Sequence, residues 1–324
     1  MSLLMNQLTK EIYQITIPTP FLVGPVNTYL IKGDVLTLVD TGPKTEEAFH
    51  AMKDQLKEIN IEIEDIEVVI LTHHHPDHIG LLEKFLPKAK VYGHKNLVPW
   101  LTRDANFLAR THQFFQSFYK KHGVPKQLIQ DIEKANEYYR SFSAKGDVDH
   151  VLNEGEPIPG LSGWTTIETP GHAQSHISLL REEDGTLIAG DHLISHISSN
   201  AIIEAPYEDG SDRPKTLLQY RDALKKCIDV KVCYSGHGKI INEPRELIES
   251  RLIEQEKKAV YFKEMLGYDA MTSFELCKKV YHRLYEKQPG LTLSETLGHL
   301  DLLEVNGEVT TENRDGVFYY HICK

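Results

Sequence analysis

The sequence lacks the features of a membrane-spanning or disulfide-stabilised protein. Only four of its 324 residues are cysteine, and none forms a C-x-x-C pair. Three stand in mainly apolar surroundings, which is typical of reduced core thiols, so we expect a cytoplasmic protein. No apolar run reaches about 18 residues, and no basic segment precedes an apolar one at the N-terminus, so we expect no membrane span and no signal peptide. Met1–Leu4 leave open whether the natural start is Met5.

Positive charge is also scarce. The chain has 36 Lys and Arg against 47 Asp and Glu, a formal net charge of −11. Nucleic acids and anionic membranes attract positive surfaces, so this balance argues against a general polyanion binder, although a local basic patch stays open. The length suffices for one large domain and a small one.

What the sequence does have is a dense histidine cluster, THHHPDHIG, at Thr72–Gly80. The apolar, β-branched segment Ile66–Leu71 precedes it and predicts a buried strand. Pro76 argues against a regular helix through the cluster, so we expect the next helix at Ile79–Phe85. Neutral imidazole and carboxylate are usual ligands of zinc and similar metals, whereas a solvated polar loop would not need so many histidines.

The cluster contains the pattern H-x-H-x-D-H, which resembles the metal motif of the metallo-β-lactamase superfamily. Four further segments match that family in the expected order. They are VLTLVDTG upstream, and then ETPGH, TLIAGDH and KVCYSGHG, each at the end of an apolar or strand-like run. The resemblance covers residues of about 10 to 245. The Gly-Gly of the glyoxalase II branch is Gly80-Leu81 here, so the catalytic part is glyoxalase II-like only in outline.

The resemblance implies an α/β fold: an αββα sandwich of two mixed sheets with helices outside and metals at one edge. We place this catalytic domain at residues 1–245. Within it we expect strands at Ile12–Ile17, Asn27–Ile31, Val35–Asp40, Ile66–Leu71 and Lys90–Tyr92, and a helix at Lys44–Asn60.

The resemblance also implies a ligand set for two divalent metal ions, for which Zn²⁺ is the first expectation and Fe or Mn stay open. His73, His75 and His172 would hold one ion. Asp77, His78 and His237 would hold the other, and Asp191 would bridge the two. A metal-bridging hydroxide would attack the substrate, so no serine or cysteine nucleophile is needed.

Other polar residues near these motifs have supporting or open roles. Asp77 is the expected catalytic residue, orienting the hydroxide and accepting its proton. Asp40 is expected to hold a ligating histidine from behind. His74 alternates with the ligands and should point away, whereas His192 is a candidate for the pocket mouth and for substrate binding.

Residues 97–146 interrupt the pattern with a mostly helical insertion. Nine of the 28 aromatic residues lie there, and eight Lys and Arg against four Asp and Glu give it a positive balance. One interpretation is a helical lid over the metal site, with Arg103 and Arg110 as partners for an anionic substrate. The other is a helical hairpin whose aromatics are ordinary core, and both can hold.

Residues 246–324 are expected to form a helical connector and a small winged-helix-like domain. Helices are predicted at Glu243–Leu266, Met271–Tyr285 and Leu291–Val305, with Ser273 and Ser294 as N-caps. A hairpin around Glu312–Asp315 follows. This order resembles the branch that includes β-lactamase-like protein 2, a putative endoribonuclease.

The sequence therefore predicts a dinuclear metal-dependent hydrolase of a small, anionic acyl substrate such as a thioester, ester or lactone. The alternative is a phosphodiesterase or endoribonuclease acting on single-stranded RNA, by analogy with the winged-helix branch. A binding protein with a vestigial site is disfavoured by the complete ligand set. Expected partners are a small molecule, with no duplex DNA and no membrane, and a homodimer stays open.

We predict that the whole protein does not bind duplex DNA. A DNA-binding winged helix brings Lys and Arg of its second helix to phosphates, but Leu291–Val305 contains neither. Residues 245–324 carry 11 basic and 14 acidic side chains. Anisotropy titrations with a labelled duplex should show no binding at low or moderate salt, and binding that weakens steeply with salt would contradict the prediction.

Overall fold

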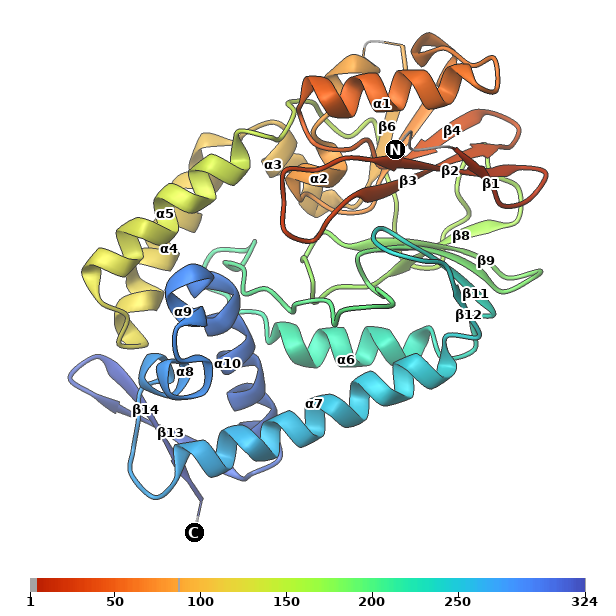
Figure 1. Cartoon of the computed structure of the whole chain (residues 1–324). Helices are drawn as coiled ribbons and strands as arrows, with labels where there is room; N and C mark the ends of the chain where they lie inside the picture. Colours follow the sequence, from red (N-terminus) through yellow and green to blue (C-terminus); the bar gives the residue numbers. More distant parts are fainter. Residues whose placement is uncertain (1–4, 87, 324) are drawn as a thin grey trace.

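Two mixed β-sheets lie face to face in the computed structural model, which describes residues 5–86 and 88–323 (Figure 1). The question of Met1–Leu4 lies outside these residues. The first sheet has the order β1 (Asn6–Gln7), β2 (Ile12–Ile17), β3 (Val26–Lys32), β4 (Leu36–Val39), β5 (Val68–Leu71), β6 (Lys90–Gly93) and β7 (His150–Val151). The second has the order β12 (Ile241–Asn242), β11 (Val232–Ser235), β10 (Thr186–Gly190), β9 (Ile177–Arg181) and β8 (Trp164–Glu168).

Strand β3 shows why the first sheet is covered on both faces. Its side chains alternate, so Tyr29 and Ile31 join the core between the sheets while Val26 and Leu30 join the core on the outer face. From β4 to β7 the neighbouring strands are parallel, so their carboxyl ends meet at one edge.

Helices cover the outer faces of both sheets. Helix α1 (Glu46–Lys57) packs Ala48, Met52 and Leu56, spaced four apart, into the core of the first sheet. Helices α6 (Thr216–Lys226) and α7 (Arg245–Leu266) lie on the second sheet. The expected α/β sandwich is confirmed, while the domain boundary at 245 stays a prediction.

The insertion forms an antiparallel pair of helices that extends to the left in Figure 1, α4 (Ala105–Lys121) and α5 (Lys126–Arg140). The short helices η3 (Lys95–Leu97) and α3 (Val98–Leu101) lead into it. At its tip, the His122 carbonyl accepts a hydrogen bond from Phe274 N at 3.2 Å, so the insertion is attached to the C-terminal region. Its aromatics serve both expected roles: Phe118 and Tyr119 belong to the large core, and others line a cavity described below.

The C-terminal region contains α8 (Ser273–Tyr281), α9 (Leu284–Lys287), α10 (Pro289–Val305) and the hairpin β13 (Val309–Arg314) and β14 (Val317–Ile322). Both expected N-caps are wrong. Thr272 caps α8 because its hydroxyl accepts from Glu275 N, and α10 begins five residues before Ser294, at Pro289. Helix α10 is buried for most of its length, so little of it is exposed to a partner, and the winged-helix assignment stays a prediction.

The chain directly after β5 also differs from expectation. Helix α2 (Pro76–Ile79) starts inside the histidine cluster, and the short helices η1 (Ile63–Asp65) and η2 (Leu82–Lys84) lie on either side of β5 and α2. Pro76 occupies the first helical position, where a missing N–H has no cost, so it starts a helix there rather than excluding one. Gly80 then passes so close to the backbone of Lys44 and Phe142 that a Cβ would collide with both.

In the part of the chain that the structure describes, no helix is both long and apolar enough to cross a bilayer.

A buried ion pair connects α10 to the segment before α6. Arg213 donates to both oxygens of Asp301, at 2.8 and 2.6 Å, and the Asp301 side chain is 5% exposed. We expect Asp301→Ala to lower the free energy of unfolding by about 3–5 kcal/mol, because the Arg213 charge would stay buried without a partner. The control Asp222→Ala breaks an exposed pair with Lys225 and should cost less than about 1 kcal/mol in the same urea titration. Equal losses would contradict the prediction.

Candidate metal centre

The predicted ligands converge at one edge of the sandwich. Each follows an element end: β5 leads to His73 and His75, α2 carries Asp77 and His78, and three further strand ends supply the rest. His172 follows β8, Asp191 follows β10 and His237 follows β11. Together these residues make three overlapping groups of potential metal ligands, with the ligand atoms of each group within 4.8 Å of one another.

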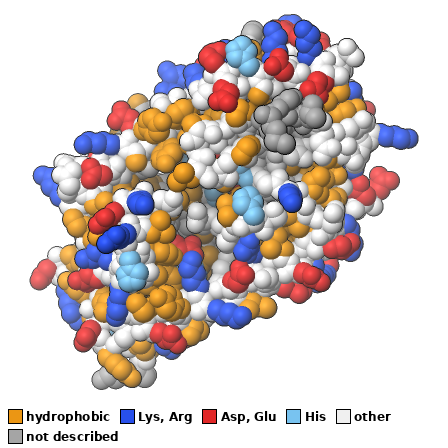
Figure 2. Space-filling model, viewed as in Figure 1, with side chains coloured by type: hydrophobic (Ala, Val, Ile, Leu, Met, Phe, Trp, Pro, Cys, Tyr) orange, Lys and Arg blue, Asp and Glu red, His pale blue; other side chains and the backbone are white. Residues whose placement is uncertain are grey.

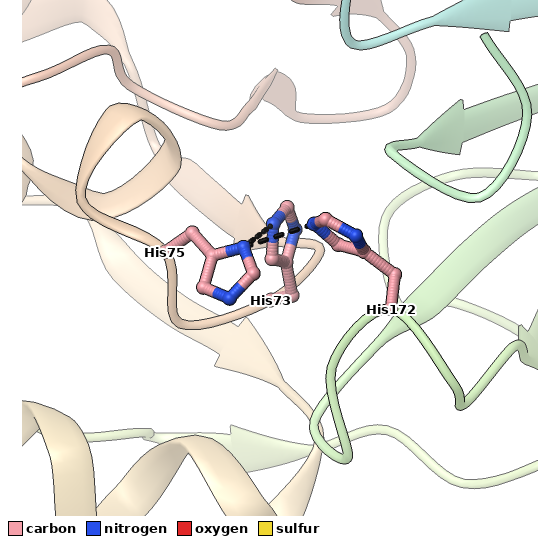
Figure 3. A group of neighbouring side chains, drawn as sticks. All are labelled: His73, His75 and His172. Carbon is pink, nitrogen blue, oxygen red and sulfur yellow. Dashed lines mark hydrogen bonds between the residues drawn. The ribbon is translucent and has the colours of Figure 1, made fainter. Parts of the chain in front are cut away.

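The first group is His73, His75 and His172 (Figure 3). His73 Nε2 lies 3.0 Å from His75 Nδ1, which lies 2.9 Å from His172 Nε2. Three imidazole nitrogens therefore point at one position, and only a proton or a cation can satisfy their lone pairs there. The histidines come from both halves of the sandwich, as the two loops in Figure 3 show.

The second group is Asp77, His78 and His237, and Asp191 lies between the two groups. His237 Nε2 is 3.3 Å from Asp77 Oδ2. Asp191 Oδ1 lies 3.3 Å from His78 Nε2, and its Oδ2 lies 3.6 Å from His172 Nε2. One carboxylate thus faces a histidine of each group, the arrangement that a bridging ligand requires.

Orphaned buried atoms test whether these residues fit a metal. His78 Nε2, Asp191 Oδ1 and His237 Nε2 are buried and have no hydrogen-bond partner among the described residues. Buried polar atoms are rarely left unpaired, because their desolvation is then uncompensated. All three belong to the predicted ligand set, so the donor set fits bound divalent cations.

Asp40 holds the site from behind. Its Oδ2 lies 2.8 Å from His78 Nδ1 and accepts from Thr72 Oγ1, while its Oδ1 accepts from Thr72 N at 2.8 Å. Asp40 has a φ of 61°, an uncommon backbone conformation for a residue other than glycine. Asp40 therefore fixes the ring of His78 so that Nε2 faces the second group.

The other ligating histidines are oriented by backbone carbonyls. His237 Nδ1 donates to the Pro25 carbonyl at 2.8 Å, and His172 Nδ1 donates to the Asn200 carbonyl at 2.9 Å. These bonds place the proton on Nδ1 and leave Nε2 free to bind a metal.

Burial and charge act differently on the two groups. Burial, together with neighbouring histidines, lowers the pKa of His73 and His75, which favours the neutral imidazole that a metal needs. Burial also opposes a charge on His237, but Asp191 and Asp77 outweigh it and raise its pKa to about 10. Metal binding at the second group must therefore release a proton.

Two residues behind the ligands were missed by the sequence reasoning. His176 lies against His73, with ring centroids 4.8 Å apart, and its Nε2 accepts a hydrogen bond from Asp191 N at 3.1 Å. Thr72 links Asp40 to the ring of His73. His176 stands four residues after His172, a spacing that offered a signal, whereas nothing in the sequence singles out Thr72 or the Pro25 carbonyl.

Histidines outside the ligand set have other surroundings. His74 stacks on Trp100, with ring centroids 4.4 Å apart, and its Nδ1 lies 2.9 Å from Ser175 Oγ, so it points away from the ligand groups as expected. His192 is fully buried against Tyr220 and has no surface to offer at a pocket mouth, so that expectation is wrong.

A cavity of about 790 Å³ begins at His75 and continues under the insertion. Neither expected arginine lines it. Arg103 donates to the Ser143 carbonyl, and Arg110 pairs with Asp209 beside a second cavity of about 620 Å³. The cations at the first cavity are Lys134 and Arg140, on the exposed side of α5. Arg103 and Arg110 were chosen by composition, but the helical phase of the insertion directs other cations to this cavity.

Groups of histidine and aspartate at one edge of an αββα sandwich define a class, the metal-dependent hydrolases of this fold. A profile of the metallo-beta-lactamase superfamily matches residues 22–237. The chain belongs to this superfamily, and the resemblance noted from the sequence is confirmed.

Individual relatives agree with this assignment. "Probable metallo-hydrolase YqjP" of Bacillus subtilis (strain 168) is 40% identical over 321 residues, 98% of this chain and 99% of the relative. A "Beta-lactamase-like protein 2 homolog" of Caenorhabditis elegans is 26% identical over 82% of this chain and 73% of its own length. The crystal structure of a metallo-beta-lactamase family protein from Thermus thermophilus superposes with a TM-score of 0.79 at 26% identity, covering 98% of this chain and all of that one.

We expect Asp191→Ala to reduce metal binding at both groups, because Asp191 faces a histidine of each. Elemental analysis of protein purified without chelator and dialysed should find less than about one metal per chain in the variant, against about two in the parent. His74→Gln is the matched control, since His74 stands within the motif but outside the ligand groups, and it should keep the parent's metal content. Equal occupancy in Asp191→Ala and the parent would contradict the assignment.

Proposed function

We propose that the protein is a dinuclear metal-dependent hydrolase of a small acyl substrate, a thioester, ester or lactone with an anionic group. The cavity that begins at the metal ligand His75 and runs beneath the insertion is the observation that carries this proposal. Its size is that of a site for a small molecule.

The chain's own residues have separable tasks in this proposal. His73, His75 and His172 hold one cation, Asp77, His78 and His237 hold the other, and Asp191 bridges. Two such ions, when bound, supply an acidified water and polarise the attacked group. Asp77 lies beside both histidines of its group, so its carboxylate is placed to orient that water and accept its proton.

The walls of the cavity favour an acyl substrate. The buried side is lined by apolar or aromatic residues, among them Trp100, Phe107 and Ile203, and the exposed rim carries Lys134 and Arg140. An apolar portion can be buried inside while an anionic group meets the rim cations.

Single-stranded RNA is the competing substrate. A long strand needs an open basic groove with stacking faces. The cavity instead lies beneath the insertion, and on the face shown in Figure 2 acidic and basic side chains are intermixed among hydrophobic ones, without a continuous basic field across its described part. These features rank the acyl substrate above RNA.

A substrate panel tests the proposal. Metal-loaded protein should hydrolyse members of a set of thioesters, esters and lactones and leave single-stranded RNA and a phosphodiester intact. Asp77→Asn should lower kcat by about 10²–10⁴-fold, the usual contribution of a positioned acid or base. Efficient RNA cleavage with every acyl compound ignored would show that the alternative is right.

A further inference from the structure

The inference concerns the cavity beneath the insertion and rests on the proposed function, because it specifies the substrate of that site. Phe107, Leu108, Thr111, Phe115 and Tyr119 of α4 all line the cavity. They recur every three or four residues and so share one face of the helix. At 1.5 Å per residue, the stripe from Phe107 to Tyr119 is about 18 Å long. The cavity is therefore elongated along α4.

A chain of ring contacts connects the metal centre to the start of this stripe. The His75 and His74 rings are 4.9 Å apart, His74 stacks on Trp100 at 4.4 Å, and Trp100 meets Phe107 edge-on at 5.1 Å. His74, His75, Trp100 and Phe107 all line the cavity, so its wall is continuous from a metal ligand to α4.

The wall opposite α4 is also apolar. It is formed by Ile132 of α5 and by the segment Ile202–Ala205, of which Ile203 is 5% exposed. In this segment Glu204 is buried too, but its oxygens already accept hydrogen bonds from Gln174 N at 2.7 Å and Tyr207 Oη at 3.0 Å. At the rim, Glu133 is engaged by Gln116 and His112. The deep part of the cavity therefore offers apolar surface and few free polar groups.

We propose that the cavity binds the unbranched aliphatic chain of an acyl ester or thioester. The acyl carbonyl lies at His75, and the chain extends along α4 toward Tyr119. A compact or branched acyl group would leave the far end of this elongated cavity unfilled, and a polar chain would be desolvated against Phe115 and Ile203 without partners.

Chain length is the variable that tests this. Against a series of straight-chain acyl thioesters from acetyl to dodecanoyl, kcat/KM should rise by about threefold per methylene while each added group is buried, and then level off. Rates are measured below the micelle concentration of each compound. A flat series, or one that declines from acetyl onward, overturns the proposal.

Paired variants on α4 separate the channel from general effects of mutation. Leu108→Trp fills the cavity and should reduce the ratio of dodecanoyl to butanoyl kcat/KM by at least about tenfold. Ala109→Trp places the same side chain at an exposed neighbour outside the cavity and should leave the ratio unchanged. Phe115→Ala should move the optimum to longer chains, while Phe114→Ala, at the adjacent residue that lines the other cavity, should not. Equal effects within either pair overturn the proposal.

Binding without turnover distinguishes this proposal from the proposed function. Straight-chain carboxylates from acetate to dodecanoate are titrated calorimetrically into the metal-loaded protein, where affinity should rise with chain length and fall in Leu108→Trp. Graded binding with no hydrolysis of any ester or thioester supports the channel and overturns the hydrolase proposal. Hydrolysis of short thioesters with binding independent of chain length overturns the channel alone.

Discussion

The metal centre depends on hydrogen bonds that join the two sheets at the edge where the ligands lie. Asn27 of β3 donates its backbone N–H to the Gly236 carbonyl at 2.7 Å, and its side-chain amide donates to the carbonyls of Ser235 and Gly238. Ile177 N donates to the Thr72 carbonyl at 2.9 Å on the other side of the site. The loop of His237 and the loop of His73 are therefore each tied to the opposite sheet, and this fixes the separation of ligands that no single sheet could position.

Asp40 shows how this geometry combines with electrostatics. It sits at the end of β4 with an unusual backbone conformation and supports both the start of the histidine cluster and the ring of His78. Strain of this kind persists where surrounding contacts over-determine it, commonly at functional sites. The buried atoms that lack partners, on His78, Asp191 and His237, make the same edge costly without cations, so metal binding and folding stability are coupled.

The insertion links this edge to the rest of the molecule. Its tip packs Phe118 and Tyr119 against the core shared with the C-terminal helices, while another face of the same helix lines the cavity at the metal centre. A helix presents different faces to two environments, so one segment can be both structural core and substrate wall. The C-terminal region thereby supports the cavity from a distance, through His122 and α8, without lining it.

The sequence by itself determined the family, the order of strands and the ligand set, because ligands that follow strand ends keep their spacing and their apolar runs in the chain. It could not decide where side chains of the insertion face, since that depends on helical phase and packing: Arg110 turned to another cavity and His192 became core. It also misjudged Pro76, because a proline that breaks a helix interior is suited to a helix start, and only the fold shows which position it occupies. The carbonyls of Pro25 and Asn200 were decided by tertiary structure alone, because a backbone group carries no signature in the sequence.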